Sequence, residues 1–174
     1  MNHIGTLLGV GKSRKVYEYL LDTDYVVKIN DESYKSYDSS YNPNQCEFKT
    51  FTLLQSYGLS ELLAPCRMEG DHLLMLKTSP LPKGQYEVPI IFCDRPKNWG
   101  VVNDKLYRID YSWNTEVIDN QLVFVKKQNE FQLEKFNVIV DKLIFDDERE
   151  SVIVPLSLDV LTKLFSTTMT MIVD

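Results

Sequence analysis

The sequence has few of the residues that build disulfide-rich or metal-clustered proteins. It contains 3 cysteines and 2 histidines in 174 residues. The cysteines, Cys46, Cys66 and Cys93, lie far apart and form no Cys-x-x-Cys pair, so a zinc site is not expected. An odd number of widely spaced cysteines favours reduced thiols over a disulfide framework, and we therefore expect a cytoplasmic protein.

Long apolar runs are missing as well. The most apolar late stretch, from Val152 to Val173, contains Asp159 and Lys163 together with many hydroxyl side chains. Such a segment is not expected to cross a bilayer, and the first residues show no basic segment followed by an apolar one, as a secretory signal would. The sequence therefore predicts no membrane partner.

Positive charge is also scarce. The chain has 19 Lys and Arg against 25 Asp and Glu, which gives a net charge of −6. Proteins that bind the phosphate backbone of nucleic acids concentrate basic side chains on one face, so no nucleic acid partner is expected. A nucleotide remains possible, because its phosphates need only one or two cations.

The pattern of the first half predicts an α+β fold. Residues 4–9, 15–21 and 25–30 are rich in β-branched and aromatic side chains and are separated by turns that contain Gly or Asp, which is typical of strands. Asn42 followed by Pro43 predicts the start of a helix, and Gly58 predicts its end. The helix should therefore run from about residue 43 to residue 57.

The second half is predicted to consist mostly of strands. These strands cover residues 72–77, 100–102, 106–109, 121–126, 136–145 and 151–156, with a turn at 103–105 and a final helix over about 157–165. A change of composition near Asn114 marks a boundary. We expect a small lobe over 1–80, a hairpin segment over 81–113 and a β-rich C-terminal extension over 114–174.

The segment Leu8-Gly9-Val10-Gly11, followed by Val16-Tyr17, describes a strand, a glycine turn and a second strand. Glycines allow a backbone to bend over a polyphosphate and to present N–H donors to it, although many ordinary turns share this pattern. Lys28 lies between apolar residues on the third predicted strand. It is either a solvent-facing lysine or one held beneath the glycine turn to neutralise phosphate oxygens.

Glu47 distinguishes these alternatives. On the predicted helix, Glu47, Phe51 and Leu54 share one face at i, i+4 and i+7. A buried carboxylate needs a cationic partner, for which Lys28 is the candidate. If Glu47 is instead exposed in the first turns, it contributes only a favourable interaction with the helix dipole, worth about 0.3–1 kcal/mol.

A further set of polar residues surrounds the predicted hairpin. Asp94 and Asn98 precede the hairpin, and Asp110 follows it. Residues at the two ends of a hairpin can converge, and oxygen ligands of this kind suit Mg²⁺ when phosphate oxygens complete its coordination. The same residues can also be ordinary turn and strand-end positions.

From Leu7 to Trp113, the order of these elements resembles that of protein kinases and of small bacterial and phage kinase-like proteins. Gly9 and Gly11 resemble the glycine-rich loop, Lys28 the lysine of the third strand, and Glu47 the glutamate that pairs with it. The segment Asp94-Arg95-Pro96-Lys97-Asn98 resembles the catalytic loop, and Asp110-Tyr111-Ser112 resembles the DFG segment.

The resemblance implies a kinase-like N-lobe, made of an antiparallel sheet and one helix, with a shortened and partly β-rich second lobe. It implies ATP and Mg²⁺ as cofactors. The catalytic residues would be Asp94, Lys28 and Glu47; the nucleotide would contact Gly9, Gly11, Val16, Lys28 and Met75; and Asn98 and Asp110 would hold the metal.

Three departures from the family leave the function open. Asp94 and Asn98 are one residue closer together than usual, Phe92-Cys93 replaces the family's His-Arg, and no substrate-binding helices are predicted after Trp113. The chain is therefore a phosphotransferase acting on a protein or small-molecule hydroxyl, a catalytically weak or inactive kinase-like protein that docks a partner, or an unrelated α+β interaction domain.

Overall fold

The chain has an α+β fold and divides into two compact units. One unit comprises Met1–Pro82 with Arg95–Ser112, and the other comprises Lys83–Asp94 with Trp113–Asp174. The expected hairpin segment over 81–113 is thus divided between the two units. The computed structural model describes residues 3–33, 42–92, 95–111, 114–118, 121–127, 144–146, 151–155 and 157–174.

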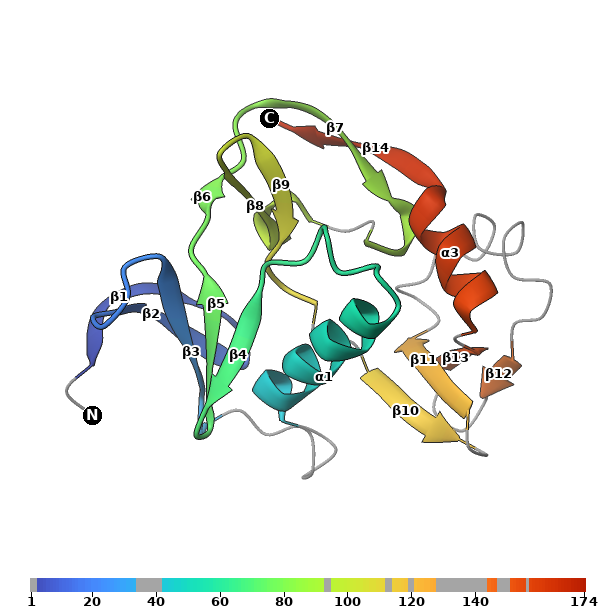
Figure 1. Ribbon diagram of the computed structural model, residues 1–174, viewed down its shortest axis with the longest axis horizontal. Coiled ribbons are helices and arrows are strands. Elements are labelled where there is room, and N and C mark those ends of the chain that lie inside the picture. Colours follow the sequence, from blue (N-terminus) through green and yellow to red (C-terminus); the bar gives the residue numbers. More distant parts are fainter. Residues whose placement is uncertain are drawn as a thin grey trace. The chain divides into compact units, whose positions relative to one another are not determined.

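The first unit contains a five-stranded antiparallel sheet in the order β1-β2-β3-β5-β4 (Figure 1). Its strands are β1 (Ile4–Val10), β2 (Arg14–Tyr19), β3 (Tyr25–Asn30), β4 (Cys66–Glu69) and β5 (His72–Leu76). The predicted strands over 4–9, 15–21, 25–30 and 72–77 are confirmed to within two residues. β4 was not predicted, because a strand of four residues shows too little periodicity to be recognised.

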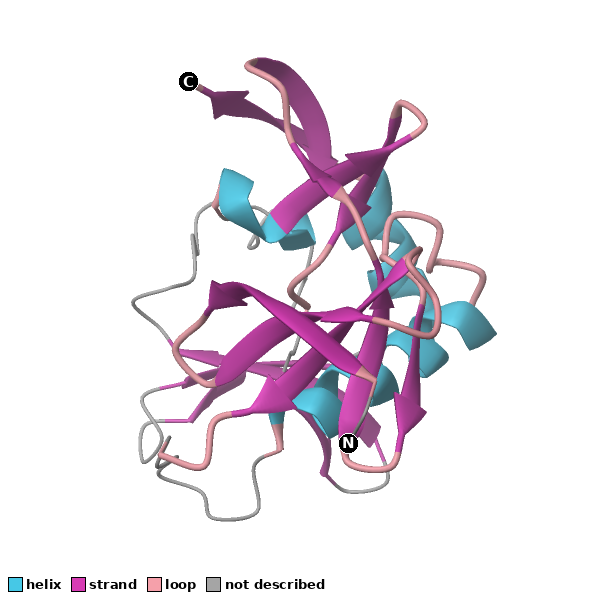
Figure 2. Ribbon diagram, turned by 90° about the vertical axis from the view of Figure 1, so that its left-hand side faces the viewer, coloured by secondary structure: helices cyan, strands magenta, loops and turns pink. Residues whose placement is uncertain are grey.

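Helix α1 (Pro43–Ser56) packs against β3, β4 and β5 (Figures 1 and 2). The side chain of Asn42 caps its start by accepting a hydrogen bond from the Gln45 amide at 3.1 Å. Gly58 follows the helix with φ +70°, a left-handed conformation that glycine adopts at low cost. Both predicted ends are confirmed, and the helix turns its buried face toward the sheet.

A second, three-stranded sheet in the same unit has the order β6-β8-β9 and consists of β6 (Ser79–Pro80), β8 (Trp99–Val102) and β9 (Lys105–Arg108). Asn103 and Asp104 join β8 to β9 with φ +49° and +63°, as a tight hairpin turn requires. A Cβ added to Gly100 would lie 2.0 Å from the Thr78 hydroxyl, so only glycine allows β8 to approach β6 this closely. The short 3₁₀ helix η2 (Pro96–Asn98) leads into β8.

In the second unit, α3 (Leu158–Ser166) leads into β14 (Thr168–Val173), which pairs with β7 (Gly84–Pro89). Leu161 and Leu164 are buried, and Phe165 contacts Phe92 of the 3₁₀ helix η1 (Ile90–Phe92) edge to face, with ring centroids 5.1 Å apart. The predicted helix over 157–165 is confirmed. The strands β7 and β14 were not predicted, since each contains exposed polar residues that blur its pattern.

The second unit also contains a four-stranded antiparallel sheet in the order β10-β11-β13-β12. Its strands are β10 (Asn114–Ile118), β11 (Gln121–Lys127), β12 (Ile144–Asp146) and β13 (Ser151–Pro155). The strand predicted over 136–145 lies outside the described residues except for its last two positions, which belong to β12. Among the described residues, no helix combines the length and apolar character that a membrane span needs.

Candidate functional site

Three of the predicted nucleotide-binding residues lie in one row across the sheet. Gly9 on β1 is the register partner of Val16 on β2, and Val16 is the partner of Lys28 on β3. Directly paired residues project from the same face of a sheet, so the Val16 and Lys28 side chains share a face. Met75 on β5 joins this face, because it pairs with Val26, which lies two residues from Lys28.

The glycine turn lies beside this row. The Gly11 amide donates to the Arg14 carbonyl at 2.8 Å, which closes the turn between β1 and β2. No atom lies within 4 Å of the position that a Cβ on Gly9 would occupy. The backbone around Gly9 thus has open space on the side where a side chain would stand.

Lys28 and Glu47 form the ion pair that the sequence predicts. The Lys28 ammonium lies 2.9 Å from Glu47 Oε2, and both residues are buried. Glu47 shares the inward face of α1 with Phe51 and Leu54, as the i, i+4, i+7 spacing predicts. The alternatives of a solvent-facing lysine and an exposed helix-start glutamate are therefore wrong.

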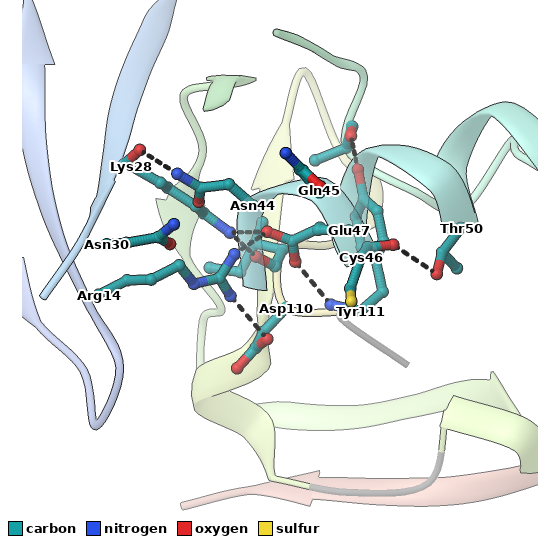
Figure 3. A network of polar contacts seen from close by, with 12 residues as sticks. Arg14, Lys28, Asn30, Asn44, Gln45, Cys46, Glu47, Thr50, Asp110 and Tyr111 are labelled. Atoms are coloured by element: carbon teal, nitrogen blue, oxygen red, sulfur yellow. Dashed lines mark hydrogen bonds and ion pairs between the residues drawn. The ribbon is translucent and has the colours of Figure 1, made fainter. Parts of the chain in front are cut away.

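Arg14 is a member of this cluster that sequence reasoning missed. Its guanidinium donates to Glu47 Oε2 through Nη1 and to Asp110 Oδ1 through Nη2, the latter at 3.1 Å (Figure 3). A signal for it was available, because strand alternation places Arg14 on the same face as Val16, two residues later. One arginine thus joins the buried Glu47 to Asp110, the predicted metal ligand.

The segment from residue 109 to residue 111 is fixed by successive hydrogen bonds to the same cluster. The Ile109 carbonyl accepts from the Lys28 ammonium, and the Tyr111 amide donates to Glu47 Oε1 at 2.8 Å (Figure 3). Asp110, between them, receives Arg14 on its carboxylate, while its carbonyl accepts from Arg108 Nε at 2.6 Å. Asp110 and Tyr111, the first two residues of the predicted DFG-like segment, are therefore held by this cluster. Ser112, the third, lies outside the described residues.

Asn98 and Asp110 lie at neighbouring ends of the β8–β9 hairpin. Trp99 and Arg108 are register partners, and one step outward the Ile109 amide donates to the Asn98 carbonyl at 2.8 Å. The hairpin thus brings Asn98 next to the residue that precedes Asp110. Asp94, the third member of this predicted set, lies outside the described residues.

These residues offer oxygen ligands suited to magnesium. The Asp110 side chain is 47% exposed, so its carboxylate is accessible, and the Asn98 backbone lies next to Ile109, whose amide donates to the Asn98 carbonyl. Among the residues that the structure describes, no three His, Cys, Asp or Glu side chains gather as a metal cage would require. The accessible Asp110 carboxylate is the type of ligand that a hard cation takes together with phosphate oxygens and water.

Burial and charge compete at the centre of the cluster. Burial alone would raise the pKa of Glu47, but the charges of Lys28 and Arg14 and the Tyr111 amide outweigh it, and the pKa is lowered. Burial lowers the pKa of the Lys28 ammonium, and Glu47 acts in the opposite direction. Glu47 is thereby held as a carboxylate that accepts hydrogen bonds from three donors.

Two further residues anchor the cluster to its surroundings. The side-chain amide of Asn44, on the first turn of α1, donates to the Lys28 carbonyl at 3.0 Å and to the Asp71 carbonyl at 3.1 Å. The Tyr111 hydroxyl donates to the Ala64 carbonyl, and burial raises the pKa of Tyr111 well above its ordinary value. Buried polar side chains thus attach the start of α1 and the end of the β8–β9 hairpin to neighbouring backbone carbonyls of the first unit.

No family model matches the chain, and no curated protein is similar enough to count as a relative. The functional argument therefore rests on the geometry of this cluster.

Proposed function

We propose that the chain is an ATP- and Mg²⁺-dependent phosphotransferase of the protein-kinase-like type, which acts on a protein or small-molecule hydroxyl. The observation that carries the proposal is the position of Asp110, which one arginine joins to the buried pair of Lys28 and Glu47. The sequence order of Lys28, Glu47 and Asp110 implies the same activity through its resemblance to protein kinases. A structural core has no need of four buried or half-buried charges at one point, because apolar residues of similar size are often at least as stabilising.

Lys28 would bind phosphate oxygens, and Glu47 would hold the ammonium in place. The backbone around Gly9 and Gly11 would cover the phosphates, with the Gly11 amide holding the turn closed through the Arg14 carbonyl. Val16 would pack against the nucleotide. Asn98 and Asp110 would hold Mg²⁺, which would neutralise charge on the phosphates. Asp94 would orient the attacking hydroxyl and accept its proton.

Adenine would lie against the segment that follows Met75. The amides of Leu76 and Lys77 already donate to the Pro65 and Asp24 carbonyls, at 2.9 and 2.8 Å. Adenine would therefore contact Thr78 and the backbone carbonyl groups of this segment. The buried Met75 side chain would form the apolar floor beside it.

Binding and transfer are tested separately. A ligand at 100 times its dissociation constant stabilises a fold by about 2.7 kcal/mol, so ATP with Mg²⁺ is expected to raise the thermal midpoint of the wild-type protein. Lys28→Met and Asp110→Asn are expected to reduce that shift. Lys15→Met is a matched control, because Lys15 lies on the neighbouring strand β2 and pairs with Asp31 at 3.2 Å.

Transfer is measured with γ-labelled ATP, as label incorporated into the protein itself or into host lysate. Lys28→Met, Asp110→Asn and Asp94→Asn are each expected to abolish it, and Lys15→Met is expected to preserve it. Retained transfer in both Asp94→Asn and Asp110→Asn would overturn the enzyme proposal. A thermal shift without label transfer would instead favour a kinase-like binding protein, and the absence of a shift would favour an unrelated interaction domain.

A further inference from the structure

The two terminal nitrogens of the Arg14 guanidinium lie in two different environments. Its side chain is 9% exposed, and its Nη1 end lies on Glu47, which is fully buried. Its Nη2 end lies 3.1 Å from Asp110, whose side chain is 47% exposed. The arginine therefore reaches from the interior of the unit to the accessible carboxylate that is proposed to hold the metal.

The four charges of the cluster balance without a ligand. Arg14 and Lys28 are positive, and Glu47 and Asp110 are negative. A metal ion on Asp110 competes directly with the guanidinium for the same carboxylate, because two cations on one carboxylate repel each other. Once the metal holds Asp110, the Nη2 end of Arg14 can turn to the anion of a ligand, whereas the Nη1 end keeps Glu47.

The nearest place for that anion is beneath the glycine turn. The Arg14 carbonyl closes this turn by accepting from Gly11, and the Arg14 side chain projects from the same face as Val16 and Lys28. An arginine guanidinium carries its N–H groups in a planar fork that matches phosphate oxygens.

We propose that Arg14 is a second phosphate-binding cation beside Lys28, held by Asp110 until a divalent metal takes over that carboxylate. This inference rests on the proposed nucleotide site and adds a residue that no feature of the sequence resemblance assigns. It makes phosphate binding depend on the metal in two ways. The metal contributes its own charge, and it also releases the arginine.

The test is a double-mutant cycle in which calorimetry measures the affinity for ATP in the presence of EDTA. Asp110→Asn keeps the shape of the side chain and removes the charge that holds Arg14. It is expected to raise the affinity for metal-free ATP about tenfold, a typical effect of one charge-assisted hydrogen bond. In the Arg14→Met background the same change is expected to have less than about a threefold effect, since only the general loss of repulsion remains.

With Mg²⁺ present, Arg14→Met is expected to weaken ATP binding about tenfold, whereas Lys15→Met leaves the affinity unchanged. An equal gain from Asp110→Asn in both backgrounds would overturn the inference, and so would wild-type affinity for magnesium nucleotide in Arg14→Met. If the wild-type protein binds neither form of ATP, the proposed function itself fails, which is a different result.

Arg14→Lys keeps the proposal testable if Arg14→Met does not fold. A lysine ammonium can lie on Glu47 or on a phosphate, but it cannot bridge both as a guanidinium does. The affinity of Arg14→Lys for magnesium nucleotide is expected to fall several-fold while its far-ultraviolet circular dichroism stays that of the wild type. An arginine with only a structural role would lower the thermal midpoint of the variant without changing this affinity.

Discussion

The two faces of the five-stranded sheet are built on different principles. On one face, Tyr19, Val27 and Leu74 form an apolar cluster that Tyr17, Tyr25 and other partly buried side chains extend. On the other face, the buried side chains include Lys28, Arg14 and, from α1, Glu47. Val27 and Lys28 are consecutive residues of one strand, so alternation alone assigns them to opposite faces.

The difference shows which face is built for stability alone. The apolar face closes by burial of surface and needs no particular geometry beyond good packing. The charged face requires both carboxylate oxygens of Glu47 to accept hydrogen bonds, and a missing partner leaves an uncompensated charge. This cost is the physical reason why we propose the nucleotide on that face.

The largest expected effect comes from removing the centre of the charged face. Glu47→Ala leaves Lys28 and Arg14 buried without their shared carboxylate and frees the Tyr111 amide. We expect it to lower the free energy of unfolding by about 3–5 kcal/mol, measured by urea denaturation. Lys49→Ala, an exposed position on the same helix, is the control and should change stability by less than about 0.5 kcal/mol.

An intermediate effect is expected on the apolar face. Val27→Ala removes two buried carbons from a side chain that is 2% exposed, and it should cost about 2 kcal/mol of unfolding free energy. The thermal shift with ATP and Mg²⁺ should stay at its wild-type size, because the substituted side chain faces away from Lys28. Loss of that shift in a folded Val27→Ala protein would contradict the division of roles between the faces.

The smallest effect is a dependence on pH. Glu47 has a lowered pKa in the folded protein, against an ordinary value of 4.5, so the stability it contributes is present above that value and is lost as the pH falls through the folded pKa. The difference in unfolding free energy between the wild type and Glu47→Gln should therefore shrink on acidification below about pH 4.5. Denaturation curves recorded between pH 7 and pH 3 check this, and parallel profiles for the two proteins would show that Glu47 is not the titrating group.

Sequence patterns predicted the elements whose signals are local. Asn42, Pro43 and Gly58 fix the ends of α1 by capping and turn chemistry, which depend only on neighbouring residues. The inward position of Glu47 followed from helical spacing, and its partner followed from the high cost of an unpaired buried carboxylate. In the second unit, β7 and β14 pair across more than 70 intervening residues, a relation that no local pattern encodes.

Arg14 and Asn44 show where the prediction of the site ended. Each lies at a position whose face could be deduced, Arg14 by strand alternation and Asn44 by its spacing of three residues from Glu47. Their partners, however, are set by tertiary contacts, Asp110 for Arg14 and the carbonyls of Lys28 and Asp71 for Asn44. A polar residue before a strand or in a first helical turn usually faces water, so the sequence alone favoured the wrong environment for both.

The side-chain amide of Asn44 limits how helix α1 can move relative to β3. The Asn44 side chain donates to the Lys28 carbonyl, and Glu47 on the same helix pairs with the Lys28 ammonium. Helix α1 and strand β3 are therefore joined at both the main chain and the side chain of Lys28. Outward movement of the helix would break both contacts together and leave the buried side-chain amide of Asn44 without its acceptors. Outward displacement of the helix is thereby disfavoured in this protein.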